Sequence, residues 1–174
     1  MVIEGQTVEL KPHSMKRLLF IAAIVALFAS CEKQGVPHTG DVSGNLYGVW
    51  SLKTKTVVTQ TNNGPETVDA DYTNNHFYVA FGEFPFPHAI AKKGSFTSFD
   101  LDDVDVDAVR FTFNADQRKI SFLSRLWLSD EILTKNMILD GTFEVLELSE
   151  QHFIIRQENS LLKTTTTYSF NRYK

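Results

Sequence analysis

The chain has 174 residues, of which 43% are hydrophobic and 22% are charged, and its formal net charge is −4. This size and mix are typical of one globular domain with a short appendage, and they leave little room for a second domain. The acidic balance argues against nucleic acid as a partner, because binding to phosphates depends on basic side chains. A single cysteine excludes an internal disulfide, so the core must stabilise the fold.

Residues 15–30 have the three parts of a secretory signal. A lysine–arginine pair supplies positive charge, an unbroken apolar run extends to Ala29, and small residues stand directly ahead of Cys31. The run is too short to span a bilayer comfortably as a permanent helix. Residues 1–14 carry two glutamates and no apolar run, so we expect the natural start to be Met15 and residues 1–14 to be a misassigned extension.

The four residues ending in Cys31, Phe28-Ala29-Ser30-Cys31, resemble the lipobox of bacterial lipoproteins, although Phe28 stands where leucine is usual. The resemblance implies that Cys31 is the lipidated first residue of the mature protein and that acyl chains such as palmitate hold it on a membrane. The alternative is an incidental thiol after a plain signal or an uncleaved anchor. Because Glu32 stands where an aspartate often retains lipoproteins in the inner membrane, we expect the outer membrane of the cell envelope and leave the leaflet open.

Residues 32–45 follow as a flexible tether, because they consist largely of glycine, proline, serine, threonine and charged residues. From Leu46 to residue 174, apolar residues recur mainly at every second position, which predicts one all-β domain. Residues 130–139 have apolar spacing close to that of a helix, and we expect a lone helical turn or a longer loop there. Short turns at residues 114–117 and 149–151 each join two strands. The expected strands are residues 46–60, 67–72, 76–81, 89–92, 96–99, 109–114, 119–124, 141–148, 152–158 and 163–173.

These strands are enough for an antiparallel up-and-down barrel of eight strands, which we expect because a closed barrel removes exposed edges. A two-sheet β-sandwich is the alternative. Gly48 and Trp50 share one face of the first strand, and Arg172 lies near the end of the last strand. If these two strands pair antiparallel, Arg172 comes beside Trp50, and a guanidinium over an indole ring is a favourable contact. Arg156 is an alternative candidate for this contact with Trp50.

The Gly48-Val49-Trp50 motif, followed by a barrel pattern and a late basic residue, resembles the lipocalin-like (calycin) plan. More narrowly, the chain resembles lipocalin-like lipoproteins of Gram-negative anaerobes over residues 46–174. The resemblance implies that Gly48, Trp50 and Arg172 close one end of the barrel and that the barrel binds a small apolar ligand. The alternative is a barrel filled by its own side chains, which meets a protein or polymer of the envelope through its loops. We expect a monomer, and the protein partner stays open.

The segment from Phe81 to His88 contains two prolines, which prevent a regular strand, and three phenylalanines, which require burial. Phe81, Phe84, Phe86 and His88 are therefore candidates for a portal over the barrel mouth or for a contact with a partner. The plainer alternative is a loop folded over the core of the barrel itself.

The acidic run from Asp100 to Asp107 offers oxygen ligands for calcium, but its alternation with valines also suits a solvated strand edge. Calcium binding there stays open. The histidines lack the spacing of a zinc site, and the sequence contains neither a nucleophile elbow nor a glycine loop for phosphate. We therefore expect no metal, no cofactor and no enzymatic activity.

Overall fold

A computed structural model describes residues 40–83, 85–94, 108–129 and 135–173. Within these ranges the chain forms β-strands and no helix, and most strands lie within a few residues of their predicted positions. The strand expected at residues 96–99 lies outside the described residues. The strands are β1 (Gly48–Thr61), β2 (Gly64–Asp71), β3 (Phe77–Gly82), β4 (His88–Lys93), β5 (Val109–Asn114), β6 (Lys119–Ser129), β7 (Asn136–Leu148), β8 (His152–Asn159) and β9 (Thr164–Arg172).

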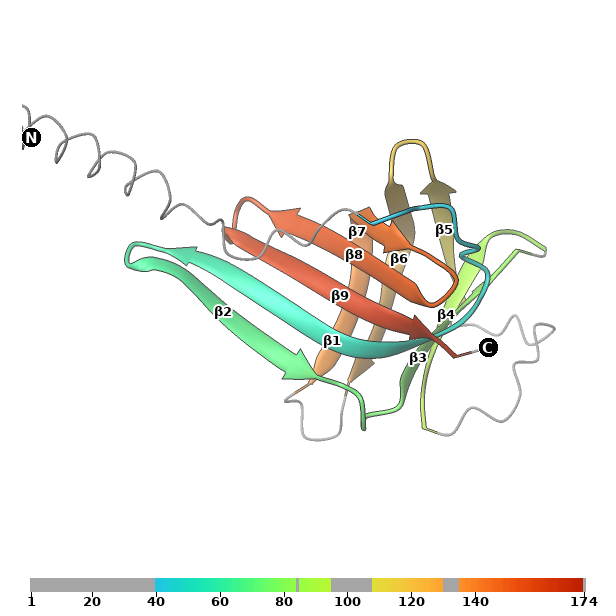
Figure 1. Ribbon diagram of the computed structural model, residues 1–174, viewed down its shortest axis with the longest axis horizontal. Helices are drawn as coiled ribbons and strands as arrows, with labels where there is room; N and C mark the ends of the chain where they lie inside the picture. The colour runs from blue at the N-terminus through green and yellow to red at the C-terminus, as the bar shows by residue number, and fades with distance from the viewer. Residues whose placement is uncertain (1–39, 84, 95–107, 130–134, 174) are drawn as a thin grey trace, which may run out of the picture. The chain divides into compact units, whose positions relative to one another are not determined.

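Eight of these strands form a closed antiparallel barrel, and β2 adds to it as an extra strand (Figure 1). From β3 to β9 each strand pairs with the next in sequence, and β9 pairs with β1. One edge of β1 pairs with β3 through residues 48–51 and with β2 through residues 54–61. The predicted all-β, eight-stranded barrel is thus confirmed, and the two-sheet sandwich is not formed.

The outer parts of β1, β8 and β9 extend beyond the barrel and, together with β2, form a sheet that we call the arm (Figure 1). It consists of residues 54–61 of β1, 64–71 of β2, 156–159 of β8 and 164–167 of β9. Threonine and valine are frequent in the arm, and β-branched residues favour extended backbone even where burial is partial. The outermost strand, β2, carries proline and three carboxylates, which discourage pairing with the edge of another chain.

A β-bulge in β1 changes which of its residues face the barrel interior. Trp50 and Leu52 are fully buried, and the register with β9 then shifts between Leu52 and Thr54. Beyond the shift Lys55 lies opposite Tyr168, a core residue, so Lys55 and Tyr168 share the interior face. The even-numbered alternation expected along the first strand therefore ends at Leu52.

The helical turn or loop expected at residues 130–139 is wrong for residues 136–139, which belong to β7. Asn136 begins β7, and Met137 and Ile138 lie opposite Leu128 and Trp127 of β6. Met137 is fully buried while Ile138 is partly exposed, which is the alternation of a strand. Local spacing of apolar residues resembled a helix, but the cross-strand partners on β6 decided the outcome. Residues 130–134 lie outside the described residues.

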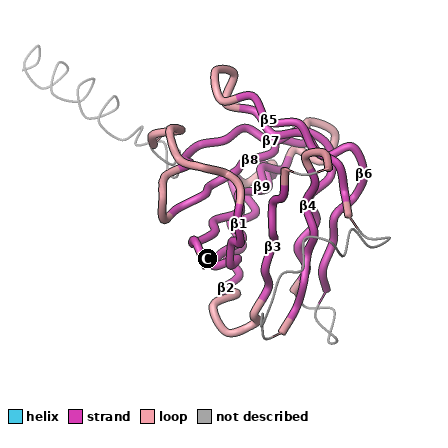
Figure 2. Tube along the Cα trace, turned by 90° about the vertical axis from the view of Figure 1, so that its right-hand side faces the viewer, coloured by secondary structure: helices cyan, strands magenta, loops and turns pink. Residues whose placement is uncertain are grey.

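Aromatic rings fill the middle of the barrel. Phe153 lies at their centre, with its ring centroid 5.5 Å from that of Trp50, 5.7 Å from that of Phe81 and 5.6 Å from that of Phe170. Such tilted, edge-on and stacked contacts add stabilisation beyond the area that they bury. Seen from the side, β3, β4 and β6 follow one another around the wall that encloses these rings (Figure 2). Side chains, rather than an open cavity, therefore occupy the centre.

Among the described residues no helix has the length and apolar character needed to cross a membrane.

Candidate functional site

Arg172 packs on Trp50 at one end of the barrel. The two residues are partners in the β1–β9 ladder, and the guanidinium carbon lies 4.2 Å from the centroid of the Trp50 ring. Nη1 of Arg172 donates a hydrogen bond of 2.7 Å to the carbonyl of Tyr47, and Nη2 donates to that of Asn45. Arg172, and not its rival Arg156, therefore occupies this place.

Arg156 instead binds a carboxylate on the barrel wall. Its Nε and Nη2 atoms donate to Oε2 of Glu144, at 3.1 and 2.5 Å. Gly48, the other member of the predicted closing motif, has a φ of 127°, a conformation that residues with a Cβ rarely adopt. The motif residues thus lie together at the closed end, where they join the start of the domain to its last strand.

The three described candidates for a portal or partner contact, Phe81, Phe86 and His88, do not form one surface. Phe81 belongs to β3 and points into the barrel, where its ring lies edge-on to that of Phe111. Phe86 lies outside the wall under the guanidinium of Arg110, whose carbon is 4.1 Å from the ring centroid. His88 is a fully buried residue of β4, with Nδ1 2.8 Å from the carbonyl oxygen of Phe86. Phe84 lies outside the described residues.

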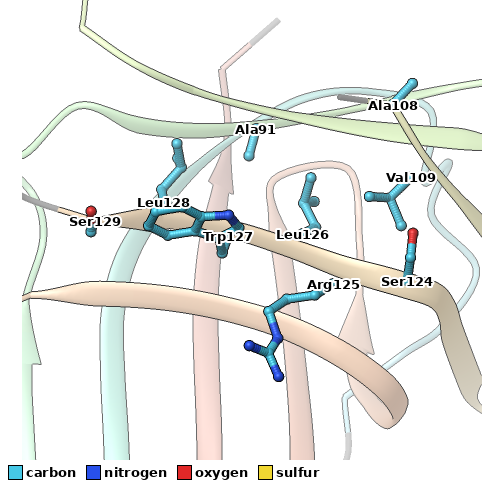
Figure 3. Close-up of a pocket in the computed structure, with 9 residues that line it drawn as sticks. All are labelled: Ala91, Ala108, Val109, Ser124, Arg125, Leu126, Trp127, Leu128 and Ser129. Carbon is cyan, nitrogen blue, oxygen red and sulfur yellow. The ribbon is translucent and has the colours of Figure 1, made fainter. Parts of the chain in front are cut away.

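A pocket of about 540 Å³ opens in the barrel wall between β4 and β6 (Figure 3). Leu126 and Leu128 of β6 point from one side of the opening and Ala91 of β4 lies on the other, as the close-up shows. The residues that line it are Ala91, Ala108, Val109, Ser124, Arg125, Leu126, Trp127, Leu128 and Ser129.

The pocket exists because β5 is short. β5 begins at Val109 and pairs with β4 only through His88 and Ala89. Further along, residues 90–93 of β4 and residues 124–129 of β6 have no strand between them in the described part of the chain. The sequence offers a reason, since Val109 and Phe111 face the interior and the same alternation continued upstream would turn Asp107 inward. An aspartate at a position where the alternation expects an apolar residue was the signal from which the pocket could have been predicted.

The rim of the pocket combines an aromatic ring with charged groups. The Trp127 side chain is 61% exposed and lies opposite Ile138 on the outer face of the wall. Beside it, Nε of Arg125 lies 3.3 Å from Oδ2 of Asp140. Apolar side chains and polar groups both line the pocket, and the polar groups contribute the larger part of its surface. Such a lining suits a small amphipathic molecule, and the volume is within the range of small-molecule sites.

A polar cluster that sequence reasoning missed lies one strand away from the pocket. Nζ of Lys55 donates to Oδ1 of Asn136 at 2.7 Å, and the hydroxyl of Tyr72 donates to the carbonyl of Asn136 at 2.8 Å. Asn136 is the ladder partner of Ser129, which lines the pocket. The hydroxyl of Tyr168 donates to the carbonyl of Ile138 at 3.1 Å. These groups satisfy the backbone of β7 where β8 does not pair with it.

Burial perturbs the pKa of two ionisable groups of this cluster, Lys55 and Tyr168. It lowers the pKa of the Lys55 amine from its ordinary value. It raises the pKa of the Tyr168 hydroxyl to about 12, against a smaller opposing effect of the hydrogen bond to the Ile138 backbone. The cluster was missed because the bulge in β1, which turns Lys55 inward, leaves no signal in the sequence.

In the described part of the chain, no group of three or more histidine, cysteine, aspartate or glutamate side chains is placed to hold a metal ion. The acidic run from Asp100 to Asp107 lies outside that part, so the structure does not test calcium binding there. Comparison of the chain with family models, with curated proteins and with solved structures finds no match.

Proposed function

We propose that the protein is a lipid-anchored, lipocalin-like binding module of the bacterial cell envelope that holds a small, largely apolar ligand in the pocket between β4 and β6. The observation that carries the proposal is the pocket itself, because it has a sufficient volume and because the side chains of Leu126 and Leu128 lie among its lining. The Trp50–Arg172 contact at the barrel end supports the lipocalin-like part of the proposal. The signal and lipobox-like residues before Cys31 support the anchor.

The filled core decides where in the barrel the ligand would bind. Phe153 and its neighbouring rings occupy the centre, so the ligand would enter from the side of the wall and not along the barrel axis. Leu126 and Leu128 would contact its apolar part, and the ring of Trp127 would cover it at the rim.

Native mass spectrometry of the mature protein, residues 31–174, purified from its own cells, tests the ligand. We expect a small molecule that is retained by the wild type and lost from a Leu128→Trp variant, because the larger side chain would fill the pocket. Leu123→Trp is the matched control, since Leu123 lies on the same strand but is exposed outside the pocket. Equal retention by both variants, or a wild type without any bound molecule, would refute the proposed site.

Metabolic labelling with a palmitate analogue tests the anchor. The label should enter the wild type and be absent from a Cys31→Ser variant, because no other thiol is present in the chain. Equal labelling of both proteins would exclude Cys31 as the lipidated residue.

A second candidate function is an interaction protein that contacts a partner through its outer wall. The exposed side chains of Trp127 on β6 and Ile138 on β7 favour it, since these ladder partners lie close together and such exposed apolar groups often mark interaction sites. In that case Trp127→Ser would abolish capture of the partner, whereas Leu128→Trp would leave it unchanged.

A further inference from the structure

The turn between β8 and β9 exposes two adjacent leucines at the end of the arm. Leu161 is 91% exposed and Leu162 is 63% exposed. Hairpin turns usually consist of glycine, asparagine, aspartate and serine, and the neighbouring turn of the arm, between β1 and β2, does contain Asn62 and Asn63. The conformation of the turn therefore does not explain why two leucines stand there.

Hydrogen bonds hold this turn in a definite conformation. The backbone N–H of Leu162 donates to Oδ1 of Asn159 at 3.0 Å, and the N–H of Gln60 on β1 donates to the carbonyl of Lys163 at 2.9 Å. Lys163 has a φ of 52°, in the left-handed region that ends such turns. The two leucines are thus presented to the surroundings by an ordered tip, and neither is part of the core.

The length of the tether brings this tip within reach of the membrane that would hold Cys31. Gly40, the first described residue, packs against the side chain of Glu147, which is the ladder partner of Ile154. From Ile154 the strand β8 leads to the tip over about 20 Å, at 3.3 Å per residue. The chain from Cys31 to Gly40 can span about 30 Å when extended. The anchor and the tip can therefore contact one bilayer at the same time.

We infer that the tip formed by Leu161 and Leu162 inserts into the lipid bilayer that holds Cys31, so that the arm is a second, reversible membrane contact. The inference rests on the proposed lipid anchor. Apolar side chains gain from leaving water for the boundary between headgroups and acyl chains, and the amine of Lys163 can reach the headgroups from beside them. One acyl anchor with a second contact holds a protein more firmly than either does alone.

A fluorescent label at the tip tests the inference in the lipidated protein. The Leu162→Cys variant is purified from membranes, labelled with an environment-sensitive dye and reconstituted into vesicles of phosphatidylethanolamine and phosphatidylglycerol. Cys31 is blocked by its lipid, so the dye reports the tip. Leu123→Cys is the control, because Leu123 is 64% exposed on the barrel wall and so matches Leu162 in exposure. We expect the dye at position 162 to shift to shorter wavelength and to be quenched by lipids brominated on their acyl chains, whereas the dye at position 123 responds to neither.

Flotation of the same vesicles separates failure of the inference from failure of the anchor. If the protein floats with the vesicles and the dye at position 162 is quenched no more than the dye at position 123, the tip does not insert although the anchor stands. If the protein does not float with the vesicles, the anchor is disproved. The inferred second contact is then disproved as well, because it depends on the anchor.

Discussion

The guanidinium of Arg172 binds the residues that precede β1 to the last strand of the barrel. It donates to two backbone carbonyls and covers the ring of Trp50. Charge-assisted hydrogen bonds of this kind contribute about 1.5–3 kcal/mol each, with a smaller contribution from the ring contact. The strength of the contact therefore depends on the forked shape of the side chain as well as on its charge.

We predict that Arg172→Ala lowers the free energy of unfolding by about 2–3 kcal/mol in urea denaturation, because it leaves the carbonyls of Tyr47 and Asn45 without this donor. Arg172→Lys should recover only part of the loss, since a lysine cannot reach both carbonyls with one fork. Arg156→Ala, which removes a partly exposed ion pair with Glu144, should cost about 1 kcal/mol or less. Equal losses for Arg172→Ala and Arg156→Ala would contradict the role of Arg172.

Tyr168 makes the stability depend on alkaline pH. Because its folded-state pKa of about 12 lies above the ordinary value of 10.0, the folded protein keeps the phenolic proton where the unfolded chain loses it. Stability from this group is complete below pH 10 and is lost as the pH rises towards 12, by about 2–3 kcal/mol in total. The lowered pKa of Lys55 acts in the opposite direction.

Urea denaturation between pH 9 and pH 12 should therefore show a weaker decline for Tyr168→Phe than for the wild type. The quantity to compare is the slope of the unfolding free energy with pH and not its absolute value. The variant also loses the hydrogen bond to Ile138, which lowers its stability at every pH. If the unfolding free energies of the two proteins fall in parallel with pH, the pKa of Tyr168 is not raised by folding.

At the scale of strands, the arm and the barrel differ in how many neighbours each strand has. β2 pairs only with β1 and its side chains are exposed, whereas β8 lies between β7 and β9 and buries Phe153 and Ile155. Local opening is easiest where few buried contacts must be broken. The arm should therefore open while the barrel stays closed.

We predict that amides of β2 exchange with deuterium much faster than those at residues 153–155 of β8, in exchange followed by mass spectrometry. Amides in the β8–β9 turn should become slower to exchange on vesicles if the tip inserts as inferred. If amides of the arm and of the barrel exchange equally slowly in solution, the arm and the barrel open as one unit.

At the scale of the whole molecule, one aromatic core joins strands that are far apart in the sequence. Phe153 contacts Trp50 near the closing residues and also Phe81 and Phe170. Loss of a buried phenylalanine side chain typically costs about 3–5 kcal/mol, because the surrounding groups fill the cavity only in part. This is a large fraction of the stability of a single domain.

Calorimetry of Phe153→Ala should accordingly show a strongly lowered melting temperature, with an unfolding free energy reduced by about 3–5 kcal/mol. Leu161→Ala serves as the control, because this exposed leucine should contribute within about 0.5 kcal/mol in solution. A loss at Leu161 as large as that at Phe153 would mean that the arm is part of the core.

The sequence by itself determined the all-β class, because the alternation of apolar and polar residues along a half-buried strand is visible locally. It also contained enough such runs for the eight-stranded barrel that the structure forms. It also offered Arg172 as a partner of Trp50, with Arg156 as the alternative, since closing an antiparallel barrel brings the first and last strands together. The register of the β1–β9 ladder then decided for Arg172.

Only the tertiary structure decided the bulge that turns Lys55 inward and the strand conformation of Met137. Each depends on the register between strands that are distant in the sequence, and a shift of one residue exchanges the two faces of a strand. Local alternation specifies the faces of a strand, but its cross-strand partners decide which face meets the core.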